Sequence, residues 1–244
     1  RGGGEATAAV LGGNVTVGSF NVLNYFTTLG QDVAGCSAYR DRAGNPVTTN
    51  GCLPRGAYTP EAFARQQEKI AAAINGLGTS VVALEEIENS EKFGLDRDHA
   101  LAHLVEALNA QAGEQRWAYV ASPATRPALA DEDVIRSAFI YQPAEVTPVG
   151  ESVILDDQTN FDNAREPMAQ LFRAADGTSE GAAGTDFVAI TNHFKSKGGS
   201  GATGDNVDAG DGQGAYNADR VGQAEALVAF AERMKAETGT DRVL

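Results

Sequence analysis

The chain has 244 residues, of which 42% are hydrophobic and 21% charged, and its formal net charge is −14. This is the composition of a globular protein long enough to bury a substantial core, and no apolar run reaches the length of a membrane span. An acidic chain repels phosphate backbones at long range, which argues against a nucleic-acid binder that acts by charge alone. The same charge is compatible with a metal-dependent enzyme, because carboxylates hold cations that then face an anionic substrate.

In chain order, the first predicted element is a strand over Val15–Val22, followed by a polar loop over residues 32–58. The loop carries the two cysteines of the chain, Cys36 and Cys52. We favour a disulfide between them over two free thiols of a cytosolic protein, because polar turn sequence would otherwise expose reactive thiols. Such a bridge contributes roughly 3 kcal/mol on the loop-entropy model and indicates an oxidising compartment.

Thr59 and Pro60 then form the start signal of a helix, and glycines 76 and 78 its stop signal. The stretch "VVALEEIEN" predicts a short buried strand that ends in acids, and a second helix ends at Gly113. Further strands are expected over Trp117–Val120, Ser137–Tyr141, Val146–Ile154, Ala169–Arg173 and Phe187–Asn192, and a last helix carries Val221, Leu227, Val228 and Ala231. This mixture of helices with strand-only runs predicts a layered α+β fold.

Both ends of the chain indicate a fragment. It begins with Arg1 and three glycines, from which we expect a longer precursor whose targeting segment is missing. After Gly239 a turn leads into Val243 and Leu244, which we interpret as the first residues of a further strand.

Acidic residues end the "VVALEEIEN" strand. Glu85 and Glu86 point to opposite sides because side chains alternate along a strand, so one of them can face a site at the strand end. A carboxylate there could hold Mg²⁺, although a solvated strand end explains the pair as well when it is taken alone. His99 and His103 have the spacing of a zinc pair but lack the metalloprotease glutamate, and we expect them to face solvent.

The stretch "FVAITNHFKSKGG" places a histidine and two lysines at the end of a strand of low polarity. Polar groups at a strand end are common carriers of chemistry in proteins with sheets. Histidine can contact a phosphate in its charged form or transfer a proton, so His193 is a candidate. Asn192, Lys195 and Lys197 supply donors and local positive charge for an anionic substrate.

Other candidates have plain structural alternatives. Asn21 and Asn24 could orient a metal-bound water or a phosphate, or could be turn asparagines. Arg165 could clamp a phosphate or pair with Glu166 on the surface. The glycine-rich segment 198–214 carries Asp205, Asp208 and Asp211, but it lacks the spacing of a calcium loop, and a flexible loop is preferred.

The order of these motifs resembles the DNase I-like endonuclease/exonuclease/phosphatase superfamily, and within it the secreted bacterial extracellular nucleases. The matching stretches are "GSFNVLNYF", "RGAYTPEAFARQQEKI", "VVALEEIEN", "NAREPMAQLF", "TNHFKSKG" and "DGQGAYNADR", which together span nearly the whole chain. The resemblance implies a four-layer αββα sandwich, incomplete at the C-terminus, with residues 1–244 as the N-terminal part of one catalytic domain.

The resemblance also implies site residues. Glu86 would hold the metal with Asn21, and His193, Arg165 and Asn21 would form the catalytic group. Asn217 and Arg220 join Asn192, Lys195 and Lys197 as expected substrate-binding residues. Two departures matter: the family tyrosine before the arginine strand has no match, which leaves the role of Asp133 open, and the "GDFN" motif and terminal Asp-His pair should follow Leu244.

From these residues we expect a secreted bacterial, Mg²⁺-dependent phosphodiesterase that hydrolyses DNA, with RNA left open as a substrate and Mn²⁺ or Ca²⁺ as alternative metals. We expect a monomer without a membrane partner. Because the group that activates water lies beyond the motifs present, the chain alone need not be active. The alternatives are a phosphomonoesterase or phospholipase of the same superfamily, and a non-catalytic secreted module that binds calcium.

Overall fold

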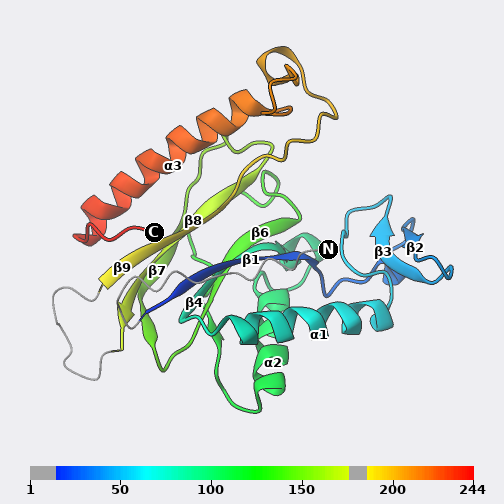
Figure 1. Ribbon diagram of the computed structural model, residues 1–244, viewed down its shortest axis with the longest axis horizontal. Coiled ribbons are helices and arrows are strands. Elements are labelled where there is room, and N and C mark those ends of the chain that lie inside the picture. The colour runs from blue at the N-terminus through cyan, green and yellow to red at the C-terminus, as the bar shows by residue number, and fades with distance from the viewer. Residues whose placement is uncertain (1–14, 176–185) are drawn as a thin grey trace.

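A computed structural model describes residues 15–175 and 186–244 of the chain (Figure 1). Its helices and strands are β1 (Val17–Tyr25), β2 (Ser37–Arg40), β3 (Pro46–Asn50), α1 (Pro60–Leu77), β4 (Val81–Glu88), α2 (His99–Ala112), β5 (Ala118–Tyr119), β6 (Ile135–Tyr141), β7 (Val146–Ile154), β8 (Arg165–Ala174), β9 (Asp186–His193) and α3 (Asn217–Thr238). Arg1 to Gly4, which suggested a precursor, lie outside the described residues.

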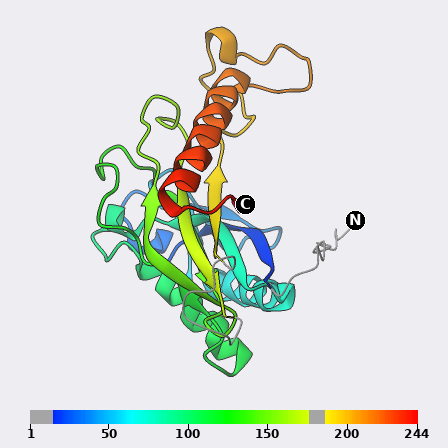
Figure 2. The ribbon, with the colours of Figure 1, turned by 90° about the vertical axis from the view of Figure 1, so that its left-hand side faces the viewer.

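Two sheets form the centre of the molecule. The first has the strand order β1-β4-β6-β5, with β1 parallel to β4 and the other neighbours antiparallel. The second is the antiparallel sheet β7-β8-β9. In Figures 1 and 2, α1 and α2 lie on the outer side of the first sheet and α3 on the outer side of the second. The order of layers is therefore αββα, which confirms the predicted α+β class.

The position of the central strand β4 between two layers explains why its sequence shows no alternation of polarity. Val82 and Leu84 pack against the helices α1 and α2, whereas Val81 and Ala83 pack against the second sheet. Because a strand between two layers is buried on both faces, it reads as a continuous apolar run. The second sheet meets α3 through a separate cluster that contains Phe230 and Met234.

Local signals set the bounds of α1. The Thr59 hydroxyl accepts a hydrogen bond from the Ala62 N–H at 3.2 Å, and Pro60 occupies the first helical position. At the other end Gly78 adopts a left-handed conformation, with φ of 62°. The predicted helix start and the stop at Gly78 are therefore confirmed, whereas Gly76, the other predicted stop residue, lies within the helix.

Three expectations need correction. The polar loop over residues 32–58 contains the hairpin β2–β3, whose strands were not predicted. In α3, Val221 and Val228 are exposed and Gln223, Phe230 and Met234 are buried, because the helical period places this second set on the face that meets the sheet. Finally, His103 does not face solvent: it is half-buried, and its Nδ1 lies 2.9 Å from the Tyr25 hydroxyl.

Two further sequence predictions are confirmed. Cys36 and Cys52 form a disulfide. Val243 forms a parallel bridge with Val188 of β9, so the chain does re-enter an extended conformation after α3. Within residues 15–175 and 186–244, no helix combines the length and the apolar character needed to cross a membrane.

Candidate active site

The ends of β1 and β4 depart from regular pairing at the same place. Asn21 pairs with Glu85 and Tyr25 with Ile87, so three residues of β1 lie opposite Glu86 alone. Leu23, Asn24 and Glu86 all have positive φ, between 53° and 67°. Left-handed residues other than glycine are uncommon, carry a free-energy cost, and cluster at functional sites.

Hydrogen bonds link this irregular turn to the acid that follows it. The Asn21 side-chain oxygen accepts the Leu23 N–H at 2.8 Å, which closes a turn within β1. The Asn24 backbone N–H donates to Glu86 Oε2 at 3.0 Å. Glu85 lies elsewhere: its Oε1 accepts the Ser19 hydroxyl at 2.7 Å. Regular alternation would place Glu86 on the helix side with Val82 and Leu84. The left-handed conformation of Glu86 breaks that alternation, and its carboxylate faces His193 of the second sheet.

The second sheet supplies the two cationic candidates. Arg165 at the start of β8 and His193 at the end of β9 are register partners. His193 Nε2 lies 3.9 Å from Glu86 Oε1, so residues more than 100 positions apart meet between the two sheets. Both side chains also have a buried nitrogen without a hydrogen-bond partner, His193 Nδ1 and Arg165 Nε. Buried polar atoms are nearly always paired, and unpaired ones are expected where a ligand or water belongs.

Asp133 connects this cluster to the loop after β3. Its carboxylate accepts two hydrogen bonds from Arg55, at 3.0 and 2.7 Å, and one oxygen lies 3.8 Å from Arg165 Nη1. A bidentate pair of this kind fixes the orientation of both groups. Asp133, whose role the sequence left open, thus lies between the two arginines, and Arg55 was not singled out although it begins the "RGAYTPEAF" stretch.

Burial shapes the electrostatics of the cluster. Burial lowers the pKa of the Arg165 guanidinium, while the Asp133 and Glu86 carboxylates oppose that effect. Burial, followed by the Arg165 charge, also lowers the pKa of the His193 imidazole, and the same two carboxylates oppose it. In the free chain the neutral form of His193 is therefore favoured at neutral pH.

The remaining sequence candidates lie in and beside the loop that joins β9 to α3, which extends beyond the strand ends in Figure 2. Lys195 and Lys197 belong to the loop, Asn192 to the end of β9, and Asn217 and Arg220 to the start of α3. The Lys195 ammonium lies 4.6 Å from the centre of the Tyr216 ring, and Lys197 Nζ lies 3.5 Å from the Gly212 carbonyl oxygen. Arg220 donates to four loop carbonyls, of Gln213, Ala215, Lys195 and Ser196. Asn192 and Asn217 are half-buried. These contacts order the loop, and the substrate-binding role of its residues stays a prediction.

A wholly buried glutamine connects this loop to the cluster. Gln223 Oε1 accepts the Lys195 backbone N–H at 2.9 Å, and Gln223 Nε2 donates to the Asn160 carbonyl at 3.0 Å. One side chain of α3 thereby joins the segment after His193 to the segment before Arg165. This buried side chain therefore links the segments that flank the paired ends of β8 and β9.

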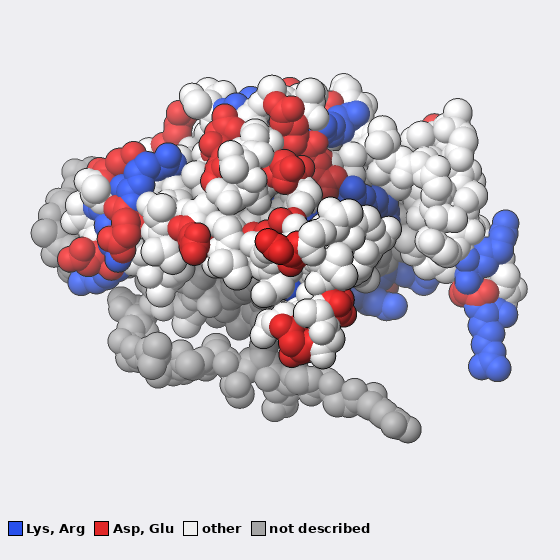
Figure 3. Space-filling view, turned by 90° about the horizontal axis from the view of Figure 1, so that it is seen from above, with Lys and Arg blue, Asp and Glu red and all other residues white. Residues whose placement is uncertain are grey.

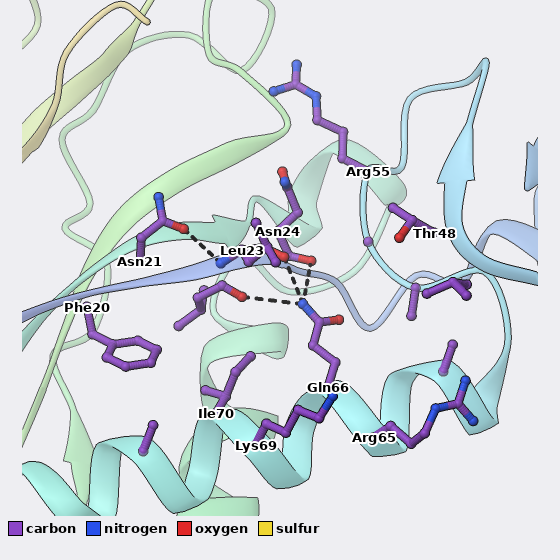
Figure 4. A pocket seen from close by; sticks show the side chains of 16 residues that line it. Phe20, Asn21, Leu23, Asn24, Thr48, Arg55, Arg65, Gln66, Lys69 and Ile70 are labelled. Carbon is purple, nitrogen blue, oxygen red and sulfur yellow. Dashed lines mark hydrogen bonds between the residues drawn. The ribbon is translucent and has the colours of Figure 1, made fainter. Parts of the chain in front are cut away.

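A cleft of about 610 Å³ opens beside Asn21 and Asn24, between the end of β1, α1 and the loop after β3 (Figure 4). Arg55, Arg65 and Lys69 lie among its lining residues, and Phe20 and Ile70 form part of its apolar wall. Gln66 of α1 points from the helix toward the turn of β1.

Comparisons with known proteins give matches among solved structures alone: no family model and no curated protein matches this chain. Among 22 solved chains that match is an endonuclease/exonuclease/phosphatase family protein from Bacteroides thetaiotaomicron, with 15% identity, a TM-score of 0.33, and coverage of 54% of this chain and 45% of that chain. An endonuclease/exonuclease/phosphatase from Beutenbergia cavernae has 17% identity, a TM-score of 0.31, and coverage of 75% and 38%.

The catalytic domain of human Nocturnin, solved with a bound sulfate anion, also matches, with 14% identity, a TM-score of 0.31, and coverage of 54% of this chain and 43% of that chain. The chain thus spans less than half the length of each of these three structures. Two of them carry the family description that the sequence motifs resemble. At these identities and TM-scores the likeness carries no argument about function, which depends on the site itself.

The donor set around Glu86 suits one kind of metal. In the described part of the chain, no group of three or more His, Cys, Asp or Glu side chains could hold an ion. Mg²⁺ does not need such a group, because it keeps several waters and is commonly bound through one or two carboxylates. Glu86 Oε1, with the amide of Asn21, which pairs with the adjacent Glu85, is a donor set of that type. The residues present therefore fit Mg²⁺ better than a metal that requires a protein cage.

Proposed function

We propose that this chain carries the active site of a Mg²⁺-dependent phosphodiesterase that hydrolyses DNA in the extracellular space of a bacterium. The observation that carries the proposal is the meeting of Glu86 with His193 and Arg165 at the ends of strands from two sheets. A carboxylate beside an imidazole and a guanidinium suits a phosphoryl group, because its oxygens need positive partners and a donor at fixed positions. The disulfide supports export, since such bridges persist in oxidising compartments.

Each side chain has a distinct role in this proposal. Arg165, held by Asp133, would bind a phosphoryl oxygen through its guanidinium. His193 is neutral in the free chain, and an anionic phosphate beside it would favour its protonated form, so it would donate a hydrogen bond to the developing negative charge. Glu86, with Asn21, would hold Mg²⁺, which when bound supplies Lewis-acid polarisation of the phosphoryl oxygen.

The charge of the molecule sets a condition on this function. Acidic side chains are spread across the face shown in Figure 3, with basic side chains among and beside them. A polyanionic substrate would therefore be repelled over much of the surface and attracted only where cations gather. Arg55 and Arg165 supply positive charge at the site.

The calcium-module alternative gains no support from the acidic loop before α3. Asp208 and Asp211 accept backbone N–H groups from Gly210 and Gln213, at 2.8 and 2.9 Å, which are the bonds of simple turns. The exposed acids of this loop thus have a structural explanation. The phosphomonoesterase and phospholipase alternatives share the same site and are separated by substrate.

The experiment is plasmid cleavage in Mg²⁺, with an EDTA control, by this chain and by the longest natural protein that contains it. Glu86→Gln should lower kcat/KM roughly a hundredfold, because it removes the charge that holds the metal. Glu85→Gln is the matched control, since this neighbouring acid bonds to Ser19 and should leave cleavage nearly unchanged. Equal rates for wild type and Glu86→Gln would contradict the metal assignment. Hydrolysis of phosphomonoesters or phospholipids instead of DNA would favour the alternatives.

A further inference from the structure

The turn that presents a hydrogen bond to Glu86 is held only in part by its own sequence, through the hydrogen bond from the Leu23 N–H to Asn21 Oδ1 at 2.8 Å. Leu23 and Asn24 adopt consecutive left-handed conformations, with φ of 53° and 54°. Leucine has no polar side-chain atom that could compensate locally, and Leu23 is 73% exposed, so burial does not hold it either. Such a conformation persists only when the surrounding structure stabilises it.

Gln66 of α1 supplies that stabilisation. Its Nε2 donor lies 2.8 Å from the Leu23 carbonyl oxygen, 3.3 Å from that of Val22 and 3.4 Å from that of Asn24 (Figure 4). The turn directs three successive carbonyls toward this one amide group. Ile70 and Ile74 of the same helix are buried in the core, so the helix holds the position of the Gln66 backbone.

The loop after β3 confines the turn from another direction. A Cβ atom at Gly56 would lie 3.0 Å from the Asn24 carbonyl oxygen and 2.5 Å from the Phe26 Cβ. This backbone approaches so closely that only glycine fits. The turn therefore has little room in which to relax.

We propose that Gln66 is a positioning residue for the candidate active site. By holding the carbonyls of Val22, Leu23 and Asn24, its amide keeps the Asn24 N–H directed at Glu86 Oε2. Oε1 of the same carboxylate is then left facing His193, as the site requires. The expected effect of Gln66 on catalysis rests on the proposed function. Its expected effect on the hydrogen bond between Asn24 and Glu86 does not.

Two variants of the full chain test this. Gln66→Leu removes the donor, and Gln66→Asn keeps an amide but shortens its reach by one methylene group. In either, amide hydrogen exchange of Asn24, measured by NMR without substrate, should accelerate about tenfold or more, because the turn opens more often. Exchange of Leu84 in β4 should not change. On plasmid substrate, kcat should fall more than KM rises, because Glu86 is misplaced rather than absent.

Gln67→Leu is the matched control. This neighbouring glutamine accepts the Tyr25 hydroxyl at 2.7 Å, so the variant loses one hydrogen bond from the same helix without touching the turn. Unchanged Asn24 exchange in both Gln66 variants, or an equal acceleration in Gln67→Leu, would overturn the proposal. A wild-type protein that cleaves no phosphodiester while Asn24 exchange still responds to Gln66 would remove the proposed function and leave the positioning role established.

Discussion

At the scale of single residues, His193 combines a buried ring with a charged neighbour on each side. Arg165 is its partner in the sheet, and Glu86 lies 3.9 Å from its Nε2. Burial and Arg165 outweigh the carboxylates, so the pKa of His193 lies below its ordinary value near 6.5. The site thus holds a neutral imidazole at neutral pH and can gain a proton when an anion enters.

This arrangement predicts the pH dependence of both the residue and the fold. An NMR titration of the free chain should place the pKa of His193 below 6.5, and Arg165→Gln should raise it because the repelling charge is lost. Between the folded and unfolded pKa values the unfolded chain binds more protons, so the free energy of unfolding should decrease as pH falls below about 6.5. His193→Gln should remove the contribution of His193 to this decrease in the free energy of unfolding. A pKa above 6.5 in the free wild-type chain would contradict this account.

At the scale of elements, the hairpin β2–β3 is closed by the disulfide and contributes no residue to the hydrophobic clusters of the two sheets. β2 is largely exposed, including Tyr39, whereas β3 is half-buried and its Thr49 is buried; a bridge between Cys36 and Cys52 closes the hairpin. Arg55 follows Cys52 by three positions and donates two hydrogen bonds to the Asp133 carboxylate. The segment after the hairpin therefore contacts Asp133, which in turn lies beside Arg165 of the site.

Removal of the bridge should therefore act locally. In the double variant Cys36→Ser, Cys52→Ser, hydrogen exchange measured by mass spectrometry should increase in β2 and β3 and not in β4 or β6. The loop-entropy model gives a loss of about 3 kcal/mol, and most of it should fall on opening of the hairpin, because little apolar surface joins it to the core. A uniform increase of exchange throughout both sheets would show instead that the hairpin unfolds together with the rest of the chain.

At the scale of the whole molecule, the site exists only while the two sheets stay face to face. Phe172 of the second sheet is fully buried and contacts Phe139 of the first edge-on, with ring centres 5.9 Å apart. Glu86 belongs to one sheet, whereas His193 and Arg165 belong to the other. Any loosening of this interface separates the carboxylate from the cations.

The interface can be tested with a single truncation. Phe172→Ala should lower the free energy of unfolding by about 3–5 kcal/mol, because it removes a buried ring and leaves a cavity between the sheets. Urea denaturation measures this loss. Val228→Ala on the exposed side of α3 is the control and should change stability by less than about 0.5 kcal/mol. A small effect of Phe172→Ala would mean that the sheets are held together mainly elsewhere.

Much of the molecule could be predicted from local sequence. Thr59 and Pro60 mark the start of α1, the continuous apolar run before Glu85 marks the central strand, and the two cysteines in polar turn sequence mark the disulfide. Asn21, Glu86, Arg165 and His193 were singled out from strand-end motifs and from the resemblance to a known family. The structure places Arg165 and His193 at the ends of β8 and β9, and Asn21 and Glu86 at the irregular pairing of β1 with β4. Caps, periodicity and turn residues act over a few positions, so they can be read directly.

The tertiary structure decided the rest. The link from Arg55 to Asp133 spans 78 positions, and the hydrogen bond from Gln66 to Leu23 spans 43. His103 has the pattern of a surface residue but contacts Tyr25, and nothing in the local sequence predicts a left-handed conformation at Leu23. Such features depend on which distant segments pack together, and a local pattern does not encode that choice. The sequence determined which side chains reach the ends of strands, and only the packing of the two sheets determined that they meet.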